Sequence, residues 1–349
     1  MRLGINLGYW GMGNDADNLE LAREADRLGY SVVWAAEAYG SDAATVLSWI
    51  AAQTEQIDVG SAVFQIPGRT PANTAMTAAT LDTLSGGRFR LGLGVSGPQV
   101  SEGWHGVNFA KPLARTREYA EIVGKALRRE RLTYDGEFFK LPLPDGPGKA
   151  LTLTVHPVRE QIPMYLAAIG PKNLGLAGEM FDGWLAIFYS PEFAPELLSS
   201  IAAGRERVGK TMAGFDVVPS VPVVIGDDVE ACAEPLRAYA ALYVGGMGSR
   251  DRNFYNQLVT RMGYGEAAGE VQEKYLARDY AGAGAALPFE FLDRTSLIGP
   301  RERIRDRLSA YAESGVTTLT IATYAGALKD RINTVRAMKE ILDESGLGD

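Results

Sequence analysis

The stretch MTAATLDTLSGGRFRLGLGVSG, residues 76–97, contains one complete step from a helix to a strand. Apolar side chains recur near helical spacing over residues 76–84, and Gly86-Gly87 supplies a turn that ends the helix. The apolar alternation over residues 89–93 predicts a short strand. The glycine-rich loop after this strand is typical of a ligand-binding loop.

The same loop contains Gly92-x-Gly94-x-x-Gly97, which has the spacing of a dinucleotide-binding fingerprint. That fingerprint should open directly into a helix within a βαβ unit. Here Pro98 follows at once, and the next helical pattern begins only at Pro112. The sequence therefore favours a loop of barrel type over a Rossmann nicotinamide site.

Composition sets the broad class of the protein. A chain of 349 residues with 46% hydrophobic content can bury a large core in one α/β barrel or in two smaller domains. The net charge of -8 and the isoelectric point near 5.1 disfavour nucleic acid and anionic membranes as main partners. The single cysteine, Cys232, excludes an intramolecular disulfide and is expected to be a buried, inert thiol.

The first residues form a strand pattern and lack the basic start and apolar run of a signal peptide. No stretch approaches the roughly 18 consecutive apolar residues that a membrane helix needs. A cytoplasmic location is therefore expected.

Strand and helix patterns alternate along almost the whole chain. Strands are predicted at residues 2–7, 31–36, 58–64, 88–93, 163–168, 183–188, 217–224 and 317–322, with helices between them. About eight such units predict a parallel sheet closed into a (β/α)8 TIM barrel that spans residues 1–349 as a single domain. Residues 132–159 are predicted to form a hairpin insertion and residues 229–295 a helical insertion in the βα loops.

In such a barrel the active site lies at the C-terminal ends of the strands. The residues at the predicted strand ends are aromatic or glycine-rich, with few acids and no histidine: Tyr9, Trp10, Glu37, Tyr39, Phe64, Arg69, Ser96, Gly97, Gly170, Pro171, Lys172 and Tyr189. This set suits a flat ring cofactor better than a hydrolytic site. No catalytic triad or metal-ligand spacing stands out, so no metal is expected.

Three segments together resemble the luciferase-like flavin and deazaflavin oxidoreductases, and within them the branch that depends on coenzyme F420. These segments are WAAEAYGSDA (34–43), RTPANTAMTAATLDTLSGGRFRLGLGVSG (69–97) and AAIGPKNLGLAGEMFDGW (167–184). The resemblance implies a barrel that binds the deazaflavin at its C-terminal mouth. It also implies hydride transfer between ring carbon C5 and a small organic substrate, and a homodimer.

The segment from 168 to 173 ends a predicted strand and opens a helix with proline near its first turn, where free backbone N–H groups form an anion site. A plain βα turn is the alternative. The resemblance implies that this segment holds the cofactor phosphate, with added attraction from the lysine; its residues are Ala168, Ile169, Gly170, Pro171, Lys172 and Asn173. It also implies a cis peptide at Ser61-Ala62 behind the central ring, and Ser96 and Gly97 are further candidate cofactor contacts.

Glu37 and His105 are the candidate catalytic residues. Glu37 follows an apolar run, so its carboxylate is expected at the mouth, where it could be ion-paired, contact the cofactor, or transfer a proton at a raised pKa. Related dehydrogenases often carry Asp-His where this chain has Glu37-Ala38, which disfavours sugar-phosphate or alcohol oxidation. Several relatives place a glutamate donor near Ser96, and Glu102 or His105 could replace it, although a structural loop role for His105 is the alternative.

Two other features remain open. Arg69 could reach a substrate carboxylate, a phosphate or the acidic cofactor tail, or form a salt bridge. Aromatic residues could wall a dry pocket, or pack in the core: Tyr9, Trp10, Phe64 and Tyr189.

The expected function is F420-dependent reduction of an activated double bond or imine. An FMN-dependent monooxygenase of the same superfamily and a cofactor-binding protein without turnover are the alternatives.

Overall fold

The computed structural model describes residues 1–11, 15–250, 252–324 and 326–348. Eight parallel strands in this part of the chain form a closed ring, because β10 pairs with both β9 and β12. In ring order they are β1 (Arg2–Asn6), β2 (Val32–Ala35), β3 (Asp58–Ser61), β5 (Phe89–Gly94), β8 (Met164–Ala167), β9 (Gly183–Ile187), β10 (Asp216–Ile225) and β12 (Thr318–Thr323). The predicted (β/α)8 barrel is confirmed.

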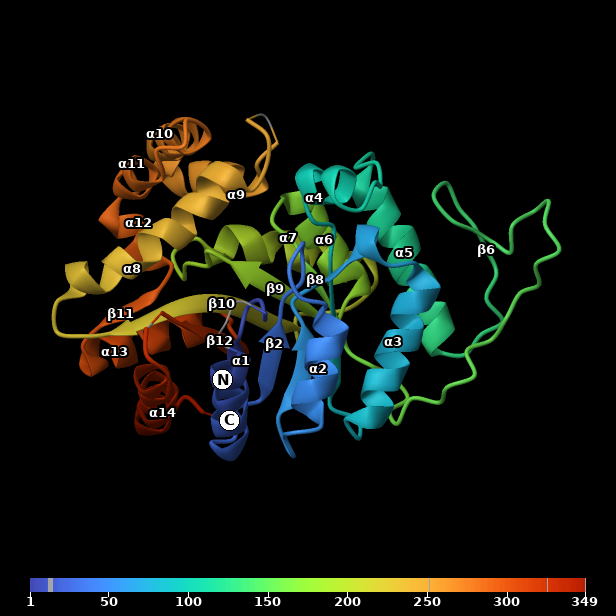
Figure 1. The fold of residues 1–349 in the computed structure, drawn as a ribbon, viewed down its shortest axis with the longest axis horizontal. Coiled ribbons are helices and arrows are strands. Elements are labelled where there is room, and N and C mark those ends of the chain that lie inside the picture. Colours follow the sequence, from blue (N-terminus) through green and yellow to red (C-terminus); the bar gives the residue numbers. More distant parts are fainter. Residues whose placement is uncertain (12–14, 251, 325, 349) are drawn as a thin grey trace.

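Helices surround this ring (Figure 1). They are α1 (Asp15–Arg27), α2 (Ala43–Ala51), α3 (Pro71–Leu84), α5 (Pro112–Leu127), α6 (Pro171–Met180), α7 (Ala194–Arg207), α13 (Arg301–Glu313) and α14 (Leu328–Ser345). None of the helices in the described residues is long and apolar enough to cross a membrane.

Further elements interrupt the regular alternation. Between β10 and β11 (Leu297–Gly299) lie α8 (Val229–Ala241), the π-turn η2 (Leu242–Gly246), α9 (Phe254–Val259), the π-turn η3 (Thr260–Tyr264), α10 (Gly265–Leu276), α11 (Tyr280–Ala285) and α12 (Phe289–Arg294). These helices lie over one end of the barrel, whereas the loop that carries β6 (Tyr134–Asp135) and β7 (Lys140–Leu141) projects from the side of α3 and α5 (Figure 1).

Several predicted boundaries are wrong. A short helix, α4 (Pro98–Gly103), begins where the sequence indicated a loop up to Pro112. The strand predicted over 58–64 is divided into β3 and β4 (Phe64–Gln65), and a 3-10 turn, η1 (Ile66–Gly68), follows β4. Within the predicted helical insertion, the chain between α9 and α10 is kinked at η3, where Gly263 has a φ of 98°.

The barrel interior is filled by two large rings that pack against glycines. Trp34 and Tyr165 meet edge to face at 5.4 Å between ring centroids. A Cβ on Gly60 would lie 2.3 Å from the Trp34 ring, and a Cβ on Gly183 would lie 2.4 Å from the Tyr165 ring. These positions must therefore lack a side chain for the rings to fit inside the barrel.

A buried ionic network closes the N-terminal end of the barrel. The carboxylate of Asp216 on β10 accepts hydrogen bonds from Arg2 on β1 (3.1 Å), Arg90 on β5 (3.4 Å), Tyr165 on β8 (3.0 Å) and Thr318 on β12 (2.8 Å). Burial opposes the charge on Arg90, but its acidic neighbours still hold the pKa of the guanidinium above its ordinary value. We call this network the floor of the barrel.

Helix α6, which follows the fifth strand of the ring, packs closely on α7 through small residues. A Cβ on Gly178 would lie 2.1 Å from the carbonyl oxygen of Ile201, and a Cβ on Gly204 would lie 2.0 Å from that of Gly175. The backbones of α6 and α7 thus touch directly, which fixes where α6 begins at the barrel mouth.

We predict that Gly178→Ala lowers the free energy of unfolding by about 1–3 kcal/mol, because the added methyl group forces α6 and α7 apart. Chemical denaturation followed by circular dichroism measures this change. Gly269→Ala on α10 is the control, because a Cβ there meets nothing within 4 Å. The control should stabilise the protein by about 0.5–1 kcal/mol, and similar losses in both variants would contradict the close packing of α6 on α7.

Candidate functional site

The first turn of α6 is open to an anion. Gly170 is the N-cap residue, Pro171 occupies the first turn, and no side chain caps the helix. Leu174 donates the first helical bond to Gly170, at 2.9 Å, so the amides of Lys172 and Asn173 precede the hydrogen-bonded ladder. The Asn173 carboxamide oxygen is buried without a partner in the described structure. The geometry has the free N–H groups of the anion site that the sequence predicts there.

The neighbouring strand ends in a similar way. β5 pairs with β8, and the chain after β5 also opens a helix with a Gly-Pro pair, Gly97 and Pro98. Ser96, just before this pair, has a φ of 61°, which is uncommon for a residue other than glycine. Two uncapped helix starts therefore lie at adjacent strand ends, beside a residue held in a strained conformation.

One basic residue near the α6 start was missed by the sequence analysis. Arg261 on η3 donates to the carbonyl oxygen of Ile169 at 2.9 Å and lies 3.7 Å from Glu196. It comes from the helical insertion, 92 positions away from Ile169. Local sequence patterns carry no signal for such a contact.

Glu37 lies at the end of β2 with its carboxylate in a complete set of hydrogen bonds. Its oxygens accept from the amides of Ala43 (3.0 Å) and Gln65 (3.1 Å) and from two nitrogens of Arg69, each at 3.1 Å. The side chains of Glu37 and Arg69 are only 11% and 14% exposed. The sequence left three roles open for Glu37: an ion pair, a cofactor contact or proton transfer. The structure shows the ion pair, with Arg69 as the partner.

Arg69 is held from three sides. Besides Glu37 it pairs with Asp42, and its guanidinium lies 4.6 Å from the centre of the Phe64 ring. Burial disfavours the charged forms of Asp42 and Arg69. Hydrogen bonds from Thr45 and the charge of Arg69 nevertheless keep the pKa of Asp42 below its ordinary value. Arg69 is therefore in a salt bridge, one of the roles considered for it.

His105 joins the same network through an amide. Its Nε2 lies 3.2 Å from Oε1 of Gln65, and the Gln65 amide nitrogen donates to the carbonyl of Glu37 at 2.8 Å. Gln65 itself is only 5% exposed. The structure thus brings the two candidate catalytic residues together through Gln65, and their catalytic role stays a prediction.

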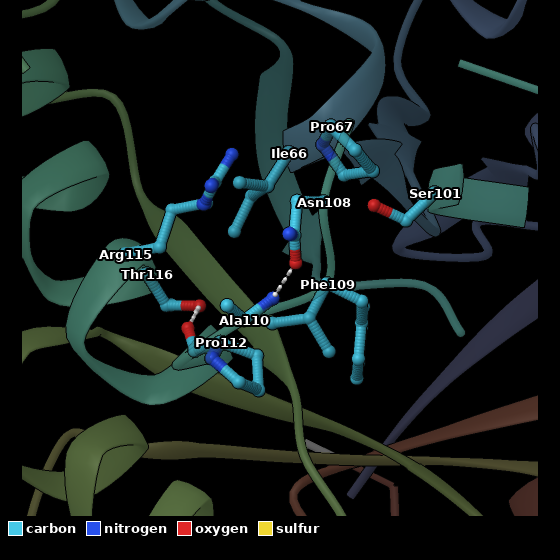
Figure 2. Close-up of a pocket in the computed structure, with 10 residues that line it drawn as sticks. Ile66, Pro67, Ser101, Asn108, Phe109, Ala110, Pro112, Arg115 and Thr116 are labelled. Atoms are coloured by element: carbon cyan, nitrogen blue, oxygen red, sulfur yellow. Dashed lines mark hydrogen bonds between the residues drawn. The ribbon is translucent and has the colours of Figure 1, made fainter. Parts of the chain in front are cut away.

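Short-range hydrogen bonds brace the connection between α4 and α5, beside the pocket drawn in Figure 2. Around a small pocket beside β4 and β5, Asn108 accepts from the amide of Ala110 (2.8 Å) and Thr116 donates to the carbonyl of Pro112 (2.8 Å). Ser101 donates to the carbonyl of Val107 at 2.6 Å. These polar groups bond within the α4–α5 connection, whereas Nε of Arg115, which also lines the pocket, is buried without a hydrogen-bond partner in the described structure.

The expected cis peptide lies one bond further along the chain. The cis bond joins Ala62 and Val63, not Ser61 and Ala62. The Ser61 hydroxyl is fully buried and bonds to Gly92, donating to its carbonyl at 2.8 Å and accepting from its amide at 2.9 Å. Ser61 therefore ties β3 to β5 behind the mouth.

The aromatic residues observed at the mouth differ in part from the expected set of Tyr9, Trp10, Phe64 and Tyr189. Tyr189 packs in the helical layer, 5.9 Å from Tyr311 between ring centres, and its hydroxyl bonds to Ser314. The preceding residue, Phe188, has a φ of 51° and instead contacts the rings of the helical insertion, including Tyr243 at 6.0 Å. Because of its left-handed backbone, Phe188 takes the position that the strand pattern assigns to Tyr189. A period-two pattern cannot reveal this exchange.

No group of three or more His, Cys, Asp or Glu side chains in the described residues is arranged to hold a metal ion.

Known proteins resemble this chain along most of its length. A Mycobacterium tuberculosis (strain ATCC 25618 / H37Rv) protein, Rv3520c, provisionally named a coenzyme F420-dependent oxidoreductase, is 42% identical over 328 residues, covering 92% of this chain and 94% of the relative. The 5,10-methylenetetrahydromethanopterin reductase of Archaeoglobus fulgidus is 28% identical over 313 residues, covering 88% of this chain and 89% of that protein.

The solved structure of the coenzyme F420 dependent tetrahydromethanopterin reductase from Methanopyrus kandleri has the same fold, with a TM-score of 0.82 at 22% identity and 97% of both chains covered. The model of the luciferase-like monooxygenase family matches residues 9–318. The chain therefore belongs to the luciferase-like monooxygenase family.

Proposed function

We propose that this protein is a coenzyme F420-dependent oxidoreductase that transfers a hydride between C5 of the deazaflavin and a small organic substrate. The observation that carries the proposal is the uncapped start of α6 at the mouth of the barrel, next to the similar start of α4. This arrangement suits a phosphate-bearing cofactor. The names of the relatives that are 42% and 28% identical support F420 as that cofactor.

The residues at the mouth fit such a cofactor. The free backbone amides of Lys172 and Asn173 would hold its phosphate. Arg261 adds a positive charge beside the same segment. When bound, the deazaflavin supplies a carbon centre that accepts or donates a hydride.

The proposed direction is reduction of an activated double bond or an imine. A base for alcohol oxidation would need a free acceptor at the end of β2, but both oxygens of Glu37 are engaged by Arg69 and by backbone amides. Glu37 is therefore proposed to position β4 and Gln65 beneath the cofactor ring, and His105 to lie at the edge of this network. Residues 1–349 would act as one barrel domain.

A homodimer is also proposed. Large apolar side chains are exposed on the neighbouring helices α2 and α3, with Trp49 54%, Met76 55% and Leu84 66% exposed. Contiguous exposed apolar side chains are typical of interaction surfaces. This surface supports pairing of two copies along α2 and α3.

The first test compares cofactors. We predict that titration of the cofactor-free protein, followed by fluorescence, gives a Kd for F420 at least about tenfold lower than that for FMN. Tighter binding of FMN would contradict the proposal and support an FMN-dependent monooxygenase, because oxygen activation needs the flavin N5 and C4a positions. Tight F420 binding without hydride exchange would indicate a binding protein without turnover.

The second test addresses Glu37. Glu37→Gln leaves Arg69 buried with only Asp42 as a charged partner, so the free energy of unfolding should fall by about 2–4 kcal/mol. Chemical denaturation measures this fall. Glu130→Gln, in an exposed pair with Arg128, is the control and should change stability by less than about 0.5 kcal/mol. Unchanged stability with lost turnover would instead assign Glu37 a direct role in proton transfer.

The third test addresses the dimer. Trp49→Glu places a charge in the proposed interface and should convert the protein to monomers, as measured by light scattering after gel filtration. Trp104→Glu is the control, because Trp104 is more exposed than Trp49, at 66%, but lies at the end of α4 and outside the proposed interface. A wild-type protein that elutes as a monomer would refute the dimer.

A further inference from the structure

Tyrosines converge around Phe188 at the barrel mouth, and only Tyr9 among them is a candidate from the sequence. They come from the ends of β1 and β12 and from α8, η2 and α9. We call the set the tyrosine cluster: Tyr9, Tyr239, Tyr243, Tyr255 and Tyr324. Phe188 lies 5.8 Å from Tyr239, 6.0 Å from Tyr243 and 6.5 Å from Tyr255, measured between ring centres.

The rings also contact one another. Tyr243 lies 4.9 Å from both Tyr239 and Tyr255, and Tyr239 lies 5.5 Å from Tyr324. Tyr9 is close enough for its hydroxyl to affect the pKa of Tyr255. Ring contacts thus join Phe188 and four of the five tyrosines, which come from elements far apart in the sequence.

The backbone that carries this surface is fixed by dedicated side chains. The side-chain amide of Asn253 donates to the carbonyl groups of Tyr243 (3.0 Å) and Val244 (2.9 Å) in the π-turn η2. Asn256 donates to the carbonyls of Val244 (3.1 Å) and Ala268 (2.7 Å). π-turns occur frequently at functional sites, and here one positions Tyr243 toward Phe188.

In the part of the chain that the structure describes, the hydroxyl groups of the tyrosine cluster have no hydrogen-bond partners. Elsewhere in the chain, Tyr30, Tyr165 and Tyr189 direct their hydroxyls to specific oxygens. Within the described residues, no hydroxyl of the tyrosine cluster makes a hydrogen bond, although every member is only partly exposed. Several polar groups that gather without partners in a half-buried place are available to a ligand.

The phenol groups of the tyrosine cluster are uncharged. Burial raises the pKa of Tyr255 to about 12 and that of Tyr239 well above its ordinary value, so the phenols stay protonated at physiological pH. Besides burial, electrostatic interactions with other tyrosines raise the pKa values of Tyr9, Tyr239 and Tyr243, and the exposed Tyr39 contributes to two of them. A carboxylate bound here would lose water without gaining a cation.

We propose that the tyrosine cluster is the substrate-binding surface, and that the substrate is a flat, uncharged molecule with a carbonyl or imine group. The rings contact the flat carbon skeleton, and the phenolic hydroxyls donate hydrogen bonds to the carbonyl oxygen or imine nitrogen. The cluster favours uncharged over anionic substrates, because its own side chains supply no positive charge. This inference rests on the proposed function and narrows its substrate class.

The test uses two probes that differ mainly in charge, trans-benzylideneacetone and trans-cinnamate. Both are titrated by calorimetry into protein loaded with oxidised F420, a state that cannot reduce them, and into the cofactor-free protein. We expect the ketone to bind at least about tenfold more tightly than the carboxylate. Tyr243→Phe and Tyr255→Phe keep the rings and should each weaken ketone binding by about 2- to 10-fold.

Two controls separate the possible failures. Tyr280→Phe on α11, at 55% exposure, should leave ketone binding unchanged, and the F420 affinity of all variants should stay within about twofold of wild type. Ketone binding that is absent, unaffected by the two cluster variants, or no stronger than carboxylate binding would overturn the inference. If F420 fails to bind, the proposed function fails, and the titration of the cofactor-free protein still tests the tyrosine cluster.

Discussion

The carboxylate of Asp216 is the group on which the rest of this barrel depends. It lies 9% exposed at the first residue of β10, where the pairing with β9 begins, and it bonds to side chains from β1, β5, β8 and β12. A buried carboxylate without partners is costly, so these strands must enter the barrel in one register to satisfy it. That register determines which residues reach the opposite end.

The mouth has the opposite character from the floor. Ser96 and Phe188 adopt left-handed backbone conformations directly after β5 and β9, and two helices begin there without side-chain caps. Unusual local conformations thus gather at the strand ends that form the mouth. Such a distribution is expected when a stable scaffold holds a site whose own geometry is unfavourable.

The sequence predicts the barrel because its helix and strand periods are clear, and its prediction of an anion site at Gly170-Pro171 has the local chemistry to support it. The short helix α4 is not predicted, because six residues that start with proline carry no measurable apolar period. Phe188 takes the position expected for Tyr189 because the backbone of Phe188 has a positive φ, which the sequence does not indicate. Contacts such as Arg261 to Ile169 join residues 92 positions apart, and only the folded chain reveals them.

The helical insertion meets the barrel at Phe188 and Tyr324 through aromatic rings, while the ion pairs that set the strand register lie at the far end. Substitutions of the partly exposed tyrosines of α8, η2 and α9 would therefore change the proposed recognition surface and leave the ion pairs of the floor in place. Mutations at these positions can change substrate specificity with little loss of stability of the barrel. Diversity among descendants of this barrel should then concentrate in the insertion, with the floor inherited almost unchanged.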